Sequence, residues 1–120
     1  MRVLIVEDNP ETAESFGHYL QLLGHETILA NTYIEAKNLA LKKDFDVALI
    51  DWWLKGSEGG LEIIKWLREN GFNQPLAVIS GDDTSHCSGI ASRIEPYARV
   101  IAVQKPVDSD KIIEKLRLML

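Results

Sequence analysis

The stretch FDVALID, residues 45–51, decides the fold because a short apolar run ends abruptly in a carboxylate. Its apolar residues stand at successive positions, which is typical of a parallel strand that is covered on both faces. Open parallel sheets place their ligand sites at the carboxyl ends of such strands. We therefore expect Asp51 to lie at the mouth of a site.

Other parts of the chain repeat this arrangement. Apolar runs at 2–6, 25–30, 76–80 and 99–103 are predicted strands, and helical patterns separate them. Five strands alternating with five helices indicate an α/β, flavodoxin-like, doubly wound parallel sheet in the order 2-1-3-4-5. With no linker or repeat, residues 1–120 are predicted to form a single domain.

Several boundaries follow from capping and turn residues. Asn31 is predicted to cap the second helix, and three glycines between 56 and 60 predict a loop over 52–60. The segment 81–97 is diluted by Ser and Gly and ends near a proline, so we expect its helix to be short or mobile.

Composition excludes several functions. A formal net charge of -5 argues against direct nucleic-acid binding, because there is no excess of Lys and Arg to neutralise phosphates. A single cysteine, Cys87, rules out an internal disulfide framework and fits a reducing cytoplasm. With no signal-peptide pattern and no apolar run of membrane-spanning length, we expect a cytoplasmic chain without membrane association.

Polar residues end four adjacent strands of the predicted sheet. They are Glu7 and Asp8 after the first strand, Asp51 after the third, Ser80 after the fourth and Lys105 after the fifth. Three carboxylates in one crevice repel one another unless a cation compensates, and an all-oxygen set favours Mg²⁺, with Mn²⁺ as an alternative. With one lysine and one hydroxyl, the set suits phosphoryl transfer, in which a carboxylate can be the nucleophile.

This ordered set resembles the receiver domain of bacterial two-component response regulators, of the CheY-like superfamily, over essentially the whole chain. The resemblance implies that Asp51 accepts a phosphoryl group from a sensor histidine kinase or a histidine phosphotransfer protein. It implies that Asp8, Asp51 and the backbone carbonyl of Trp53 ligate Mg²⁺, with Glu7 assisting through water. Lys105 and Ser80 would each bind a phosphoryl oxygen, as catalytic residues, and Lys105-Pro106 would be a cis bond.

The chain departs from the family pattern at three places. Ala102 stands where the family usually has an aromatic residue, so the usual aromatic rotamer switch cannot operate. Lys55 replaces a common proline after the acceptor, and the loop that follows is one residue longer. The stretch from Ser80 to Lys105 is also longer than usual.

The two tryptophans after the acceptor are given different roles. Trp52 is expected to have a packing role in which it covers the sheet edge. Trp53 is expected to point across the mouth of the site and to restrict water, which would slow loss of the phosphoryl group.

Three functions are compatible with these residues. The favoured one is a phosphorylation-controlled switch without an output domain, which modifies only itself and turns over no external substrate. A phosphorylation-independent interaction scaffold is the alternative, since Ala102 interrupts the usual switch. A haloacid-dehalogenase-like phosphatase ranks last, because it would need an aspartate where Trp53 stands. Taken alone, Asp51 would be interpreted as a turn-capping residue.

Overall fold

The computed structural model describes residues 1–55, 59–81 and 84–120, with the side chains of 84–88 left undescribed. Predicted features at 56–58, as well as the side chain of Cys87, lie outside the described residues. Helices and strands alternate throughout: β1 Arg2–Val6, α1 Pro10–Leu22, β2 Glu26–Ala30, α2 Tyr33–Lys42, β3 Val47–Asp51, α3 Gly59–Glu69, β4 Leu76–Ser80, α4 Thr84–Ile94, β5 Val100–Gln104 and α5 Ser109–Arg117. No helix in these ranges is both long and apolar enough to span a membrane.

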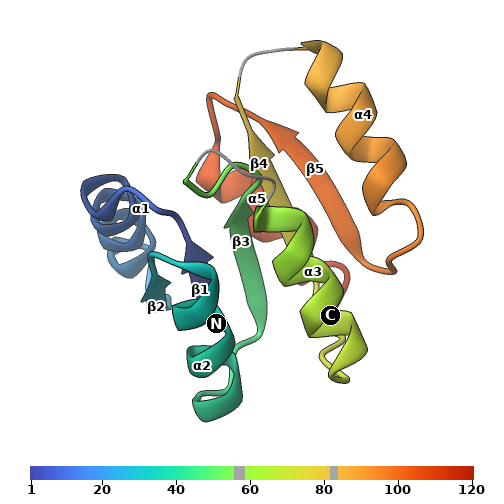
Figure 1. Ribbon diagram of the computed structural model, residues 1–120. Helices are drawn as coiled ribbons and strands as arrows, with labels where there is room; N and C mark the ends of the chain where they lie inside the picture. The colour runs from blue at the N-terminus through green and yellow to red at the C-terminus, as the bar shows by residue number, and fades with distance from the viewer. Residues whose placement is uncertain (56–58, 82–83) are drawn as a thin grey trace.

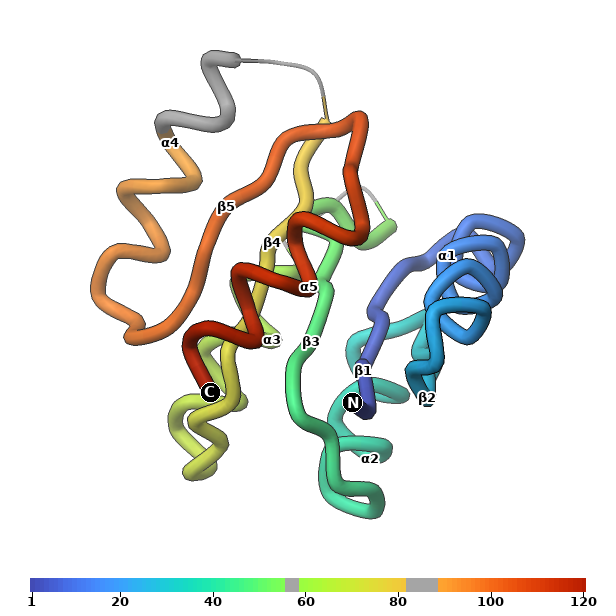
Figure 2. Tube along the Cα trace, turned by 180° about the vertical axis from the view of Figure 1, so that it is seen from behind, coloured from blue at the N-terminus to red at the C-terminus, as the bar shows by residue number. Residues whose placement is uncertain are grey.

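The strands form one parallel sheet in the order β2-β1-β3-β4-β5, which confirms the predicted topology. Helices α2, α3 and α4 lie on one face, and α1 and α5 lie on the other (Figures 1 and 2). Because β1 and β3 are neighbours, the chain after each of them leaves the sheet at the same point of its carboxyl edge.

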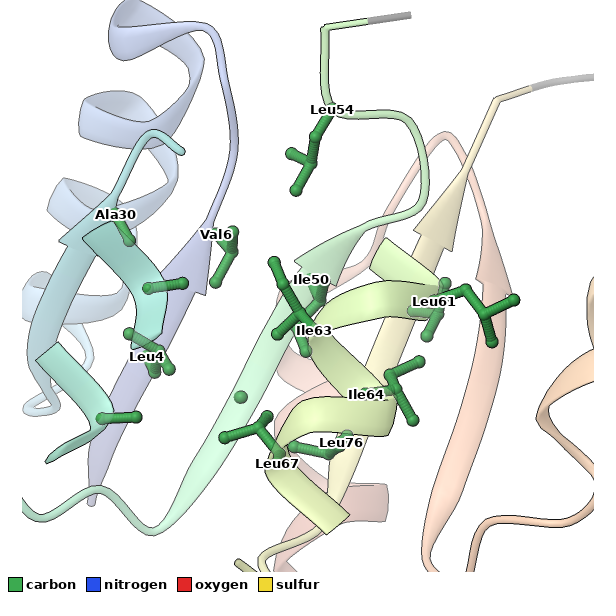
Figure 3. Packing of buried hydrophobic residues seen from close by; sticks show 14 of the residues in the cluster. Leu4, Val6, Ala30, Ile50, Leu54, Leu61, Ile63, Ile64, Leu67 and Leu76 are labelled. Carbon is green, nitrogen blue, oxygen red and sulfur yellow. The ribbon is translucent and has the colours of Figure 1, made fainter. Parts of the chain in front are cut away.

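Two apolar layers cover the sheet. On the first face, α3 places Ile63, Ile64 and Leu67 against strand residues such as Leu4 and Ile50 (Figure 3). On the second face, residues of α1 and α5, among them Leu20, Ile112, Ile113 and Leu116, cover the opposite sides of the same strands. All five residues of β3 and of β4 are buried, as expected for the central strands of a sheet covered on both faces.

The predicted loop over 52–60 is wrong at its end, because α3 already begins at Gly59. A Cβ atom on Gly59 would lie 2.8 Å from Leu54 Cβ, and one on Gly60 would lie 2.6 Å from the carbonyl oxygen of Asp51. These two glycines therefore provide space for close packing of a helix against the preceding strand, rather than flexibility for a loop.

Three other predicted boundaries are corrected. The cap of α2 is Thr32, whose hydroxyl accepts the N–H of Glu35, while the Asn31 amide instead donates to the Glu7 carbonyl oxygen at 2.9 Å. The second strand starts at Glu26 rather than at residue 25. The fifth strand starts at Val100, because Arg99 has a φ of 60°, which an extended strand does not allow.

The predicted short fourth helix is wrong in length, since α4 has 11 residues. Ile90 and Ile94 are four positions apart and are both buried in the first apolar layer. Their burial stabilises the helix despite the low helix propensity of its Ser and Gly residues. The mobility of this helix stays a prediction.

Two arginines form hydrogen bonds with backbone carbonyl oxygens at the amino edge of the sheet. Arg68 donates to the carbonyl oxygens of Phe72, Gln74 and Ala98 at 2.8–3.3 Å. Arg99 donates to the carbonyl oxygens of Asn73 and Met119, each at 2.7 Å. The end of the chain is thereby held beside the start of β5, at the edge opposite the predicted site.

Candidate active site

The carboxyl edge of the sheet brings the predicted acids together. One carboxylate oxygen from each of Glu7, Asp8 and Asp51 lies within 4.8 Å of the other two. Glu7 and Asp8 follow the end of β1, and Asp51 is the last residue of β3. Asp51 is buried, with 8% of its surface exposed, whereas Glu7 and Asp8 are partly exposed.

A positive charge lies beside this acid cluster. Lys105 Nζ is 3.8 Å from Asp51 Oδ2, and the lysine side chain is 42% exposed. Its backbone N–H donates to the carbonyl oxygen of Ser80 at 2.9 Å, which links the ends of β4 and β5. The Lys105-Pro106 peptide bond is cis, as the resemblance implied.

Ser80 and Trp53 complete the set of predicted site residues. Ser80 is the last residue of β4 and is 2% exposed. The backbone N–H of Trp53 donates to Asp51 Oδ1 at 3.2 Å, while 37% of the Trp53 surface remains exposed. Trp52, by contrast, is 1% exposed and belongs to the first apolar layer, which confirms its packing role.

The pKa of Glu7 is raised from 4.5 to about 8. Burial is the largest cause, followed by a hydrogen bond to Asp51 and by the negative charge of Asp51. The hydrogen bond to the Asn9 N–H and the charge of Lys105 oppose this shift. Without a cation, the Glu7 carboxyl therefore favours its protonated form at a higher pH than an ordinary glutamate does, because it is partly buried and Asp51 lies beside it.

These donors fit a small hard cation. Mg²⁺ prefers oxygen ligands and keeps several waters when it binds to a protein. One carboxylate oxygen from each of the three acids lies within 4.8 Å of the other two, so these residues have the ligand type and the proximity to share one such ion. A cation there would take the place of the proton that Glu7 holds, since both neutralise the same charge.

Sequence reasoning missed the residue that closes one side of the acid cluster. The backbone N–H of Lys55 donates to Asp8 Oδ2 at 2.8 Å. In the sequence, Lys55 replaces a proline that is common in the family that the chain resembles. Its contact with Asp8 could not be predicted, because a backbone N–H makes this contact and the side-chain type does not reveal it. Beneath the acids, a cavity of about 20 Å³ is lined by residues that include Thr12 and Phe16 of α1.

The fold and these residues define a class: a doubly wound α/β protein with an acidic, lysine-flanked cluster at its topological switch point. Residues 3–117 match the model of the response regulator receiver domain. The chain belongs to this family, whose members are signalling domains of two-component systems.

A curated relative supports this assignment, and solved structures share the fold. The polar-differentiation response regulator DivK of Brucella ovis is 30% identical over 115 residues, which cover 96% of this chain and 92% of DivK. A response regulator receiver protein from Pseudomonas putida superposes with a TM-score of 0.83 at 24% identity, covering 98% of this chain and 95% of that one. TrrA from Thermotoga maritima, solved in complex with Mg²⁺–BeF, has a TM-score of 0.79 at 23% identity, covering 99% and 98% of the two chains.

Proposed function

We propose that this receiver domain is a phosphorylation-dependent switch, in which Asp51 accepts a phosphoryl group from the phosphohistidine of a sensor histidine kinase or a histidine phosphotransfer protein. The observation that carries this proposal is the position of Lys105 Nζ, 3.8 Å from Asp51 Oδ2 beside the acid cluster. An acceptor of an anionic group needs positive charge on the side that the group enters, and Lys105 supplies it.

The chemistry is an in-line displacement at phosphorus. A carboxylate oxygen of Asp51 forms the new P–O bond while the P–N bond to the donor imidazole breaks, and the released imidazole is protonated by solvent. Asp8, Asp51 and the Trp53 carbonyl would hold Mg²⁺, with Glu7 assisting through water, and the ion would supply neutralising charge to the transferring group. Mn²⁺ would suit the same oxygen ligands.

Lys105 and Ser80 then have separate roles. The Lys105 ammonium would bind one phosphoryl oxygen, and the Ser80 hydroxyl would bind another. Ser80 ends β4, which is next to β3, and Lys105 directly follows β5, which is next to β4. The reaction modifies only the protein itself, so we do not assign it turnover of an external substrate, and we place it in the cytoplasm with its donor.

The solved TrrA complex with Mg²⁺–BeF supports a magnesium site in a fold of this kind. The 30% identity to DivK supports a role in signalling, although polar differentiation is said of that protein alone. The pairing of β1 with β3 also supports the proposal. The topological switch point of the sheet lies between these two strands, and ligands bind at such points in open α/β sheets.

Acetyl phosphate with Mg²⁺, followed by intact-mass measurement, tests the proposal. We expect the wild-type chain to gain the mass of one phosphoryl group, and Asp51→Asn to gain none. Asp44→Asn is the matched control, because Asp44 is exposed and precedes β3, which begins at Val47, and this variant should be modified like the wild type. Equal modification of the wild type and Asp51→Asn would refute the assignment.

A further inference from the structure

The loop after β3 returns to the acid cluster at Lys55. The Lys55 N–H donates to Asp8 Oδ2 at 2.8 Å, which is shorter than the 3.2 Å from the Trp53 N–H to Asp51 Oδ1. Lys55 has a φ of 52°, a conformation that residues with a Cβ atom rarely adopt. A hydrogen bond to a carboxylate is stronger than one to a neutral acceptor, and it supports this unusual backbone.

The loop is also attached through the two residues that precede this contact. Leu54 is 5% exposed and points from the loop toward the apolar layer that contains Ile50 (Figure 3). One residue earlier, the Trp53 N–H donates to Asp51 Oδ1. Three successive residues are thus attached to Asp51, to the core and to Asp8, so the loop and the two acids form one connected unit.

We propose that Lys55 is a positioning residue, whose backbone N–H sets the orientation of Asp8 for cation binding and couples the cation to the loop after β3. This inference rests on the proposed function, because it assumes that Mg²⁺ binds at the acid cluster. The side-chain ammonium of Lys55 has no part in it.

Two physical arguments support this role. A carboxylate has four lone-pair sites, so Asp8 can accept the Lys55 N–H and still offer oxygen to a cation. The same loop carries the Trp53 carbonyl, two residues before Lys55, so the Asp8–Lys55 bond holds two proposed ligands in one arrangement. Proline, common in the family at this position, has no N–H and has φ fixed near −65°, so it cannot form this contact.

The test compares Lys55→Pro with Lys55→Gly and Lys55→Ala. Proline removes the N–H and forbids the φ of 52°, glycine keeps the N–H and tolerates the φ, and alanine removes only the ammonium and the side chain. Mg²⁺ is titrated by isothermal calorimetry, and thermal unfolding shows that each variant is folded. Loss of a group that orients a metal ligand typically weakens metal binding by 10–100-fold, so we expect Lys55→Pro to bind Mg²⁺ about tenfold more weakly than Lys55→Gly.

Amide hydrogen exchange provides a second measurement without any metal. We expect the Lys55 amide to be protected in the wild type and to lose this protection in Asp8→Ala, which keeps the inference testable even if Lys55→Pro does not fold. Equal Mg²⁺ affinity of folded Lys55→Pro and Lys55→Gly, or unchanged exchange in Asp8→Ala, would overturn the role of Lys55.

The outcomes also separate this inference from the proposed function. A chain that binds Mg²⁺ with the expected difference between proline and glycine, but is not modified at Asp51, would refute the switch and leave Lys55 as a positioning residue. If Asp51 is modified but Lys55→Pro and Lys55→Gly bind Mg²⁺ equally well, only the role of Lys55 is refuted. A wild type that binds no Mg²⁺ would overturn both.

Discussion

Lys105 Nζ lies 3.8 Å from Asp51 Oδ2, so one ammonium group stands beside the acid that we propose as the phosphoryl acceptor. Lys105 and a bound cation would both neutralise Asp51, and they would also repel each other. Lys105 should therefore oppose cation binding while it assists the entry of a phosphoryl group. A substitution of Lys105 can separate these two effects.

Replacing Lys105 by Ala should have opposite effects on cation binding and on phosphorylation. The Lys105 side chain is 42% exposed, so solvent screens its charge and its repulsion of the cation is worth at most about 1 kcal/mol. Removing the ammonium should therefore strengthen Mg²⁺ binding by no more than about fivefold. Modification by acetyl phosphate should become much slower, since the entering anion loses its positive partner. Calorimetry and the rate of mass gain measure the two effects, and Lys111→Ala, in α5, is the control. Weaker Mg²⁺ binding in Lys105→Ala would contradict this account.

The raised pKa of Glu7 makes the stability of the metal-free protein depend on pH. Its pKa is about 8 in the folded state against 4.5 ordinarily, so the folded state binds a proton more tightly than the unfolded chain. The free energy of unfolding should therefore fall as pH rises from about 4.5 to about 8, and should level off above that range. Urea unfolding at several pH values measures this slope.

Two comparisons isolate the contribution of Glu7. The Glu7→Gln variant removes the titrating group, so its unfolding free energy should vary less over the same pH range. Saturating Mg²⁺ should also flatten the slope in the wild type, because the cation replaces the proton. If the slope of the wild type and that of Glu7→Gln are the same, the proton is not held at Glu7.

Trp53 is predicted to slow the loss of the phosphoryl group. Its backbone holds Asp51 Oδ1, and its side chain is partly exposed beside the site, where it can restrict the approach of water. We expect Trp53→Ala to lose the phosphoryl group severalfold faster than the wild type, as followed by intact mass after acetyl phosphate is removed. Trp66→Ala, which changes a tryptophan of α3, is the control, and an unchanged rate in Trp53→Ala would refute this role.

Gly60 allows close packing next to the site, and Gly89 in α4 serves as its control. A Cβ atom at Gly60 would lie 2.6 Å from a backbone oxygen of Asp51, and Gly60→Ala should destabilise the fold by about 1–3 kcal/mol. Gly89 lies in α4, and a Cβ atom there meets nothing within 4 Å, so Gly89→Ala should stabilise by about 0.5–1 kcal/mol. Denaturant unfolding measures both changes, and a neutral Gly60→Ala would contradict the packing argument.

The sheet order and the composition of the site could be predicted because both depend on residues that end strands. Parallel strands bring their carboxyl ends to one edge, so Asp51, Glu7 and Lys105 could be placed together before any distance was known. The structure confirms this order and brings the three acids within 4.8 Å of one another. Phosphorylation itself stays a prediction.

The errors came from residues whose role depends on contacts in the folded chain and not on residue type alone. Gly59 and Gly60 predict a loop by their type, but they belong to a helix that packs against Leu54 and Asp51. Asn31 and Thr32 are both good caps, and the choice between them was decided by the Glu7 carbonyl oxygen, which binds the Asn31 amide. Low helix propensity at α4 was likewise outweighed by the burial of Ile90.

The arginine contacts at the amino edge have a practical consequence for experiments. Arg99 holds Met119 beside the start of β5, and the Met1 amine lies 3.2 Å from His25 Nδ1, next to the start of β2. Both termini therefore leave the domain on the side opposite Asp51. A fluorescent protein or an affinity tag fused at either terminus should leave the approach of a phosphate donor unobstructed.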